Sequence, residues 1–286
     1  MESNLNLKAL VIGATGAVGR ELVDFLLNNE NYSKVTIIVR RMITRWVDLP
    51  EEKKNKLNII EVDSLDCMSN YEQMTSLLKE DTQYDVLFNT LGSRVGKGKD
   101  VFYKVDYTYV VDSCTLCEHY NISHFSNCSA GNADRNSCFY YSKVKGQAED
   151  AILEKNVNYI TIMKPGIITD RDNDSRCLES LAGCLCCCYR ISSKEIALAM
   201  MVDDLDYHKG NKEAKKIKID NGEMKNLAQK KIYLQDKDLY GVSEIDLNGF
   251  KTYDECKESF SERAEKQNLY RKFLIDIIQE FDDDNE

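Results

Sequence analysis

The chain has 286 residues, 43% of them hydrophobic and 30% charged, which is enough for one large α/β domain or two small ones. Its formal net charge of −10 argues against nucleic acid or an anionic membrane as the main partner. No run approaches the roughly 18 apolar residues of a membrane span, and the first residues do not resemble a signal peptide. Eleven cysteines without such a signal favour reduced thiols. We therefore expect a soluble cytoplasmic protein, with the nucleus as an additional location.

Short runs rich in Val and Ile alternate with longer segments of helical spacing. The expected strands are Lys8–Gly13, Lys34–Arg40, Asn58–Asp63, Tyr84–Leu91, His124–Ser129 and Tyr159–Lys164. The expected helices are Ala17–Asn28, Tyr71–Lys79, Val105–His119 and Tyr140–Glu154. This alternation predicts a three-layer α/β fold, in which helices cover both faces of a mostly parallel, doubly wound sheet.

The last third of the chain has a different character. Residues 1–245 are expected to form one domain, and the lysine-rich stretch at about 203–231 is interpreted as a polar surface insertion. The run "KKIYLQ" after it is expected to return as a last strand. Residues 246–286 are predicted to be a charged helical C-terminal extension, since Phe260, Leu269, Phe273 and Ile277 have helical spacing.

Three glycines, Gly13, Gly16 and Gly19, stand between the first expected strand and the first expected helix. A loop without Cβ atoms turns tightly and brings its N–H groups against a pyrophosphate, and the positive end of the helix favours the anion. This strand–turn–helix context predicts a dinucleotide site, and the alternative is a purely structural tight turn. The residues expected to contact the pyrophosphate are Gly13, Thr15, Gly16, Ala17, Val18 and Gly19.

About 20 residues beyond the glycine loop, NAD sites usually place an acidic residue against the adenine ribose. Here the strand ends in Arg40 and Arg41. Guanidinium groups grip a 2′-phosphate by bidentate hydrogen bonds, so we expect NADP(H) rather than NAD(H). The alternative is two solvated arginines at a strand end.

Two further loops are expected to reach the cofactor. Asp63, at the end of the third strand, can accept from the adenine amino group or cap the helix that follows. Leu91 and Gly92 follow the fourth strand at the carboxyl edge of the sheet, where loops line the cofactor crevice of open α/β folds.

Tyr141 and Lys145 are four residues apart and share one face of a predicted helix. An ordinary tyrosine has a pKa near 10, and a nearby ammonium group stabilises its phenolate form. Lys145 can also hold ribose hydroxyls, and Ser129 at a strand end can hydrogen-bond a substrate carbonyl. We predict a catalytic set of Ser129, Tyr141 and Lys145. The alternative is an ordinary amphipathic helix with an exposed lysine.

The glycine loop, "YSKVTIIVRR", "HFSNCSAGNADRNSCFYYSKVKGQAE" and "YITIMKPGIITDRDNDSR" together resemble the HIV Tat-interactive protein oxidoreductase family, atypical short-chain dehydrogenases/reductases. The resemblance runs from about Lys8 to Met201. It implies a Rossmann fold that binds NADPH, with Ser129, Tyr141 and Lys145 matching the serine–tyrosine–lysine set of the superfamily. It also implies that Pro165 and Gly166 pass near the nicotinamide carboxamide. The family includes members that act as regulators of other proteins.

These observations predict an NADPH-dependent reductase of a small carbonyl compound. An alternative is an NADP(H)-responsive regulator that binds partner proteins with little or no turnover, and a third is a bare structural Rossmann domain. Neither substrate identity nor oligomeric state follows from the sequence.

The cysteines and histidines are candidates for sites of their own. The cluster Cys184–Cys188 lacks zinc-site spacing, and it is interpreted mainly as a partly buried apolar segment, with acylation, oxidation or metal binding as alternatives. Cys114 and Cys117 fall in mid-helix, where core packing is favoured over redox chemistry. His119, His124 and His208 are far apart in the sequence and predict neither a triad nor a metal site.

Overall fold

The computed structural model describes residues 4–78, 83–170 and 189–229. All of them belong to the first of two units, Met1–Asp236. The cysteine cluster, the run "KKIYLQ" and the C-terminal extension lie outside the described residues.

The described residues form a seven-stranded parallel sheet in the order β3-β2-β1-β4-β5-β6-β9. Its strands are β1 Leu7–Ile12, β2 Tyr32–Val39, β3 Leu57–Glu61, β4 Val86–Asn89, β5 His124–Cys128, β6 Tyr159–Met163 and β9 Lys216–Ile219. A separate two-stranded sheet pairs β7 (Ile167–Ile168) with β8 (Arg190–Ile191). From β1, successive strands are added first on one side (β2, β3) and then on the other (β4, β5, β6), while all strands stay parallel. In open α/β sheets such a switch point, here between β1 and β4, has a crevice at the carboxyl ends of the strands.

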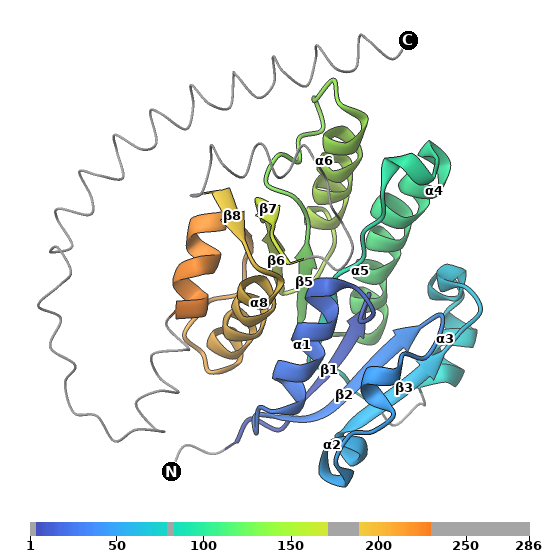
Figure 1. The fold of residues 1–286 in the computed structure, drawn as a ribbon, viewed down its shortest axis with the longest axis vertical. Coiled ribbons are helices and arrows are strands. Elements are labelled where there is room, and N and C mark those ends of the chain that lie inside the picture. The colour runs from blue at the N-terminus through green and yellow to red at the C-terminus, as the bar shows by residue number, and fades with distance from the viewer. Residues whose placement is uncertain (1–3, 79–82, 171–188, 230–286) are drawn as a thin grey trace, which may run out of the picture. The chain divides into compact units, whose positions relative to one another are not determined.

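Helices cover both faces of the sheet (Figure 1). These helices are α1 Ala17–Leu27, α2 Glu51–Lys56, α3 Tyr71–Leu78, α4 Lys99–Tyr103, α5 Tyr109–Tyr120, α6 Tyr140–Leu153 and α8 Ser193–His208. Residues 221–229 are also helical. Short helical turns span Thr44–Trp46, Leu65–Ser69 and Val95–Lys97, and a π-helical turn, Lys104–Thr108, joins α4 to α5. The predicted three-layer Rossmann-like fold is confirmed.

The core divides at the sheet into two layers, and β1 shows why. Side chains alternate along a strand, so Ala9 and Val11 enter one layer while Leu10 and Ile12 enter the other, and all four are fully buried. The second layer contains apolar residues of α3, α5 and α6. Burial on both faces explains why the strands are continuous apolar runs.

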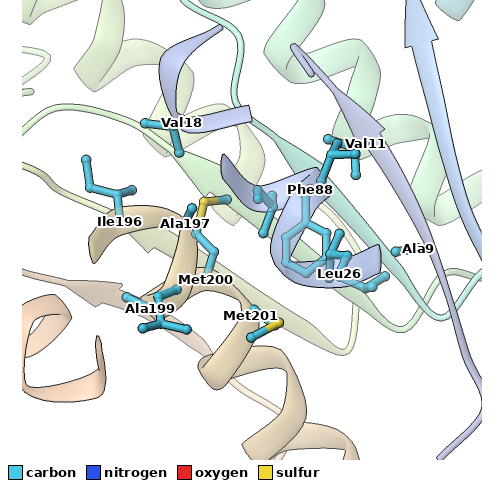
Figure 2. Close-up of a cluster of buried hydrophobic side chains, with 14 of the residues drawn as sticks. Ala9, Val11, Val18, Leu26, Phe88, Ile196, Ala197, Ala199, Met200 and Met201 are labelled. Atoms are coloured by element: carbon cyan, nitrogen blue, oxygen red, sulfur yellow. The ribbon is translucent and has the colours of Figure 1, made fainter. Parts of the chain in front are cut away.

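Helix α8 packs against α1 in the first layer. Figure 2 shows Ile196, Ala197, Met200 and Met201 gathered beside Val18 and other apolar side chains. Alanines at 197 and 199 keep the α8 backbone close to its neighbours, and methionine side chains fill the irregular space that remains. Helix α8 is buried on most sides, so its composition carries little amphipathic signal.

The lysine-rich stretch interpreted as a surface insertion is part of the fold. Residues 203–208 complete α8, and β9 extends the main sheet beside β6. In β9 the isoleucines Ile217 and Ile219 are more buried than Lys216 and Lys218. The Lys216 ammonium donates to two main-chain carbonyls at the end of α6, and Lys218 pairs with Glu149. The lysines of β9 are held by hydrogen bonds and an ion pair within the fold, so the lysine-rich sequence does not indicate the strand.

Candidate active site

At two positions, Gly13 and Gly19, the glycine loop leaves no room for a side chain. Gly13 has a positive φ of 87°, and a Cβ atom there would lie 2.6 Å from the Thr90 carbonyl carbon. A Cβ on Gly19 would collide with the carbonyl oxygen of Gly13 and lie 2.8 Å from the Ala14 Cα. Gly16 N–H donates to the Gly13 carbonyl at 3.0 Å and closes the turn. The loop is thus held against β1 and β4 by close backbone packing.

The turn presents the start of α1 to solvent. Gly16 is the N-cap of α1, so no side chain caps the helix by a hydrogen bond. The first turn of α1 contains no acidic residue. Thr15 and Gly16 are exposed, while Val18 and Gly19 are buried. A helix N-terminus without an acidic side chain attracts an anion through its N–H groups and dipole. A cradle that a Cβ would fill, next to such a helix end, fits a pyrophosphate.

Arg40 and Arg41 follow β2 and are both exposed. Neither forms an ion pair within the described residues. Arg45, a few residues further on, instead contacts Glu21 and Asp24 of α1. The two predicted phosphate-binding arginines therefore have side chains open to a ligand, whereas Arg45 is engaged by acidic residues.

Asp63 lies exposed after β3 and lines a pocket of about 450 Å³ with Ser64, Asn70 and Gln73. The cap of the helical turn that follows is Ser64, whose hydroxyl accepts from the Asp66 N–H at 3.2 Å. The capping role considered for Asp63 therefore belongs to Ser64, and contact with adenine stays a prediction.

The loop after β4 is fixed to its neighbours on both sides. Thr90 donates through its N–H and its hydroxyl to the Ile12 carbonyl, at 2.9 and 3.1 Å. The buried Asn89 amide donates to Asn127 Oδ1 at 2.8 Å, and Asn89 Oδ1 accepts from the Leu91 N–H at 3.3 Å. Leu91 and Gly92 are thus positioned beside the glycine loop, at the carboxyl edge of the sheet.

Helix α6 carries Tyr141 and Lys145 one turn apart, as predicted. The Tyr141 ring lies 5.5 Å from the Phe102 ring, and Lys145 is nearly fully buried. A Cβ atom on Gly92 would lie 4.0 Å from Lys145 Nζ. The fold therefore brings Lys145 against the loop after β4, and its burial does not fit the alternative of an ordinary amphipathic helix with an exposed lysine.

Asp106 is a residue of the site that sequence reasoning missed. It lies in the π-helical turn before α5, is fully buried, and its Oδ1 is 2.8 Å from Lys145 Nζ. Its Oδ2 accepts from the N–H and hydroxyl of Ser93 at 2.8 and 2.7 Å. Since π turns occur often at functional sites, this irregularity marks the position in three dimensions, but the letters "KVDYT" carry no comparable signal.

The environment of Lys145 keeps it charged. Burial works to lower the pKa of its ammonium group, but the Asp106 carboxylate and Tyr141 act in the opposite direction, and the net pKa is raised. The ammonium is therefore available as a hydrogen-bond donor at neutral pH. Its positive charge is also largely countered by one buried carboxylate.

Ser129 has a different partner from the one predicted. Its hydroxyl donates to Glu149 at 2.6 Å, and both side chains are buried. Glu149 also binds the ammonium groups of Lys164 and Lys218, at 2.9 and 2.7 Å. With its proton directed at Glu149, the Ser129 hydroxyl has no donor left for a substrate carbonyl. A catalytic role for Ser129 stays a prediction that this geometry does not support.

Pro165 and Gly166 follow β6 at the same edge of the sheet. The Pro165 carbonyl accepts from the Gly131 N–H at 2.7 Å, and Gly166 N–H donates to Asn221 Oδ1 at 2.9 Å. The loops after β5 and β6 are therefore joined, and their contact with nicotinamide stays a prediction.

Comparison with known proteins decides the family. A family described as NAD(P)H-binding matches residues 13–201. Protein HTATIP2 of Rattus norvegicus is 32% identical over 178 residues, covering 62% of this chain and 69% of that protein. The chain belongs to the HIV Tat-interactive protein oxidoreductase family. Membership confirms the predicted resemblance and shows an NAD(P)-binding domain.

Solved structures show the same fold at low sequence identity. The NADP complex of Pseudomonas aeruginosa RhlG has a TM-score of 0.56 at 16% identity, over 78% of this chain and all of that one. MoeE5 in complex with UDP-glucose and NAD has a TM-score of 0.55 at 12% identity, over 74% of this chain and 75% of that one. One of these structures holds NADP and the other NAD, so the two do not distinguish between the dinucleotides for this protein.

The predicted cytoplasmic and nuclear location is wrong. FMP52-1 of Scheffersomyces stipitis, a relative 28% identical over 180 residues that cover 62% of this chain and 74% of that protein, is named as mitochondrial. Other fungal relatives have the same designation. Composition and charge contain no information on this point, which explains the error. Among the described residues, no helix is both long and apolar enough to cross a membrane.

Proposed function

We propose that the protein is an NADPH-dependent oxidoreductase that reduces a small carbonyl compound. The observation that carries this proposal is the buried Lys145 ammonium, one helical turn after Tyr141 and against Gly92 of the loop after β4. Membership of an NAD(P)H-binding family supports the cofactor class. The choice of NADPH rests on the two exposed arginines after β2.

Residues from five loops, those after β1, β2, β3, β4 and β6, would hold the cofactor. The glycine loop from Gly13 to Gly19 would bind the pyrophosphate, Arg40 and Arg41 the 2′-phosphate, and Asp63 the adenine. Leu91, Gly92, Pro165 and Gly166 would line the nicotinamide end. When bound, NADPH supplies a hydride for the carbonyl carbon.

In this proposal Tyr141 donates its phenolic proton to the substrate oxygen. The Lys145 ammonium favours the phenolate that remains, and donates to the ribose hydroxyls. Asp106 keeps Lys145 in place and charged. Phe102 packs against the Tyr141 ring and restricts its orientation. Proton donation by a positioned side chain typically accelerates such a step about 10²–10⁴-fold.

Replacement of Tyr141 tests the role directly. Tyr141→Phe should leave NADPH affinity near that of the wild type and lower the rate of carbonyl reduction about 10²-fold or more. The matched control is Tyr140→Phe, because Tyr140 is adjacent but its hydroxyl donates to the Lys99 carbonyl. Equal rates in the two variants, across a panel of aldehydes and ketones reduced by the wild type, would contradict the assignment.

The NADPH preference is tested at β2. An Arg40→Ser, Arg41→Ser double variant should weaken NADPH binding more than about tenfold while NADH binding changes little, since charge-assisted contacts to the 2′-phosphate are lost. Arg45→Ser removes a nearby positive charge that acidic residues already engage, so it serves as the control. An unchanged ratio of NADPH to NADH affinity in the double variant would disprove the preference.

A second candidate function is an NADP(H)-responsive regulator with little or no turnover. Two observations favour it: the Asp106 carboxylate counters the charge of Lys145, and the Ser129 hydroxyl donates its hydrogen bond to Glu149. In this role, cofactor binding would order the surrounding loops and change what they present to a partner protein. No NADPH consumption with the carbonyl panel, combined with nucleotide-dependent protection from limited proteolysis, would support the regulator. A bare structural domain would show no NADPH binding by calorimetry.

For the location we propose mitochondria, following the names of the fungal relatives. A fluorescent fusion at the C-terminus, which leaves the amino-terminal residues free, should co-localise with a mitochondrial marker. A diffuse cytosolic signal would contradict this proposal.

A further inference from the structure

A cluster of ionisable side chains lies at the opposite end of the sheet from the glycine loop. His124 begins β5, Tyr159 begins β6 and Tyr32 begins β2, so all three are at amino ends of parallel strands. The last turns of α8 contribute Asp203, Asp204 and His208 to the same place. The proposed reaction uses none of these groups.

Two of the three histidines meet at one carboxylate, although they are 84 residues apart in the chain. The Nδ1 atom of His124 is 2.7 Å from Asp204 Oδ1, and the Nε2 atom of His208 is 3.3 Å from the same oxygen. The three donor atoms all lie within 4.8 Å of one another. The expectation that the histidines form no common site is therefore not met in three dimensions, because α8 folds back across the start of β5.

The groups around these donors have the character of an outer coordination shell. Thr161 Oγ1 is 3.0 Å from His124 Nε2, the ring nitrogen that faces away from Asp204. The Tyr32 hydroxyl donates to Asp204 Oδ2 at 2.5 Å, which leaves Oδ1 for the histidines. Ligating histidines and carboxylates in metal sites are usually oriented by hydrogen bonds of this kind.

The charge of the cluster favours a cation. Asp203 and Asp204 are both fully buried, and Lys212, which pairs with Asp203, is the lysine in contact with them among the described residues. Asp203 Oδ2 has no hydrogen-bond partner in the described part of the chain. Two buried carboxylates beside one lysine leave a negative charge that is unfavourable in a low-dielectric interior unless protonated His124 and His208 or a bound cation offset it.

We propose that His124, Asp204 and His208 form a binding site for a divalent transition-metal ion, with Zn²⁺ as the best match. Two imidazole nitrogens and one carboxylate oxygen are a ligand set that zinc accepts, with water in the fourth position. His208 is 13% exposed, while the other two side chains are fully buried, so the ion would enter past His208. Such a site would fasten the end of α8 to the sheet.

The separation of the donors indicates what metal binding would change. Tetrahedral zinc with bonds of about 2.0–2.1 Å holds its ligand atoms roughly 3.4 Å apart. The spacing of His208 Nε2 from Asp204 Oδ1 is already close to this value, whereas His124 Nδ1, 2.7 Å from the same oxygen, would have to move away from it by several tenths of an ångström. The two imidazoles, at up to 4.8 Å, need a small movement together, and His208 in the last turn of α8 has the most freedom to make it.

The test is metal binding to the full chain after dialysis against a chelator. Calorimetry with Zn²⁺ should show one equivalent bound by the wild type, and His208→Ala should weaken that binding more than about tenfold, since even loss of an outer-shell partner has an effect of this size. His119→Ala is the matched control, because His119 stacks on Tyr71 away from the cluster. Zn²⁺ should raise the melting temperature of the wild type and of His119→Ala, but not that of His208→Ala.

Cysteine-bound metal has to be distinguished, because the chain contains eleven cysteines. Co²⁺ bound by nitrogen and oxygen gives weak visible bands, whereas thiolate ligands add a strong near-ultraviolet charge-transfer band. Visible bands without the thiolate band, lost in His208→Ala and kept in His119→Ala, are the expected result. Binding that is unchanged in His208→Ala, or no binding to the wild type, would overturn the proposal and identify the cluster as a hydrogen-bonded network alone.

Discussion

The ammonium nitrogen of Lys145 lies 2.8 Å from the carboxylate of Asp106, and both side chains are buried. This ion pair joins α6, which carries Tyr141, to the π-helical turn before α5. Through Ser93 it also reaches the loop after β4. The pair therefore connects the proposed proton donor with a loop at the expected nicotinamide end of the cofactor site.

Asp106→Asn should destabilise the fold by about 3 kcal/mol, because it leaves the buried Lys145 charge without its partner while the amide oxygen can still accept from Ser93. Urea unfolding measures this loss. Ser93→Ala is the control, since it removes one hydrogen bond and leaves the ion pair, and it should have an effect of about 1 kcal/mol. Equal stability of Asp106→Asn and the wild type would contradict the importance of the pair.

The same pair predicts an effect of pH. The folded-state pKa of Lys145 is raised above its ordinary value of 10.5, so the stability it contributes is fully present below that pH and is lost as pH rises through the folded-state pKa. In Asp106→Asn the burial of Lys145 is no longer offset, and the pKa should fall. The free energy of unfolding is measured at neutral pH and at about pH 11. Its decrease between the two pH values should be larger in the wild type than in Asp106→Asn.

The glycine loop allows a paired test of backbone packing. A Cβ on Gly19 collides with the Gly13 carbonyl, so Gly19→Ala should destabilise the protein by roughly 1–3 kcal/mol and abolish detectable NADPH binding. Gly96→Ala is the control, because a Cβ there has no neighbour within 4 Å. Calorimetry with NADPH and thermal unfolding of both variants check this. NADPH binding by Gly19→Ala at wild-type strength would show that the loop does not form the pyrophosphate site.

Much of this architecture could be predicted because each signal is local. The apolar runs of β1 and β2, the glycines after β1 and the spacing of Tyr141 and Lys145 all act within a few residues of one another. Asp106 and Glu149 could not be identified in this way, since their partners are 13 to 69 residues distant. An isolated acidic letter in a helix usually indicates a solvated face, and only the fold shows that these two are buried.

The sequence of the edge strand β9 conceals its place in the sheet for a related reason. Strand β9 reads Lys-Ile-Lys-Ile, and its lysines suggested a solvated excursion. An edge strand needs only one buried face, and in the structure its lysine ammonium groups bind carbonyls and Glu149. Polar composition and membership of the sheet are thus compatible wherever charged side chains find such partners.

Replacement of Ser129 distinguishes a structural role of its hydroxyl from a catalytic one. If its hydroxyl serves Glu149, as the 2.6 Å hydrogen bond indicates, Ser129→Ala should lower the free energy of unfolding by about 1.5–3 kcal/mol and change kcat less than about threefold. If the Ser129 hydroxyl instead donated to the substrate oxygen, its loss would lower kcat about 10²–10³-fold. Ser123→Ala, which removes a hydroxyl donating to the Asp85 carbonyl, controls for the loss of a serine elsewhere. Steady-state kinetics with any carbonyl substrate the wild type reduces distinguishes the two.

The Asp204 cluster predicts a pH range of added stability in the metal-free protein. Burial alone would raise the pKa of Asp204, but hydrogen bonds from His124 and His208 lower it from 3.8 to about 2. Its contribution is therefore present above about pH 4 and lost as pH falls toward 2. Burial alone would lower the pKa of His208, but Asp204 raises it above 6.5, so the contribution of His208 is complete below pH 6.5 and lost as pH rises through the folded-state value.

The lowered pKa of Asp204 and the raised pKa of His208 together place the maximum contribution of this pair to stability between about pH 4 and pH 6.5. His208→Gln removes the charge of His208 and keeps a side chain of polar character. In the presence of a chelator, the difference in unfolding free energy between the wild type and His208→Gln should be largest in that range and shrink on both sides. His119→Gln, whose ring stacks on Tyr71 instead, should show no such peak. A difference that is flat across the range would mean that the histidine is not paired with the buried carboxylate in solution.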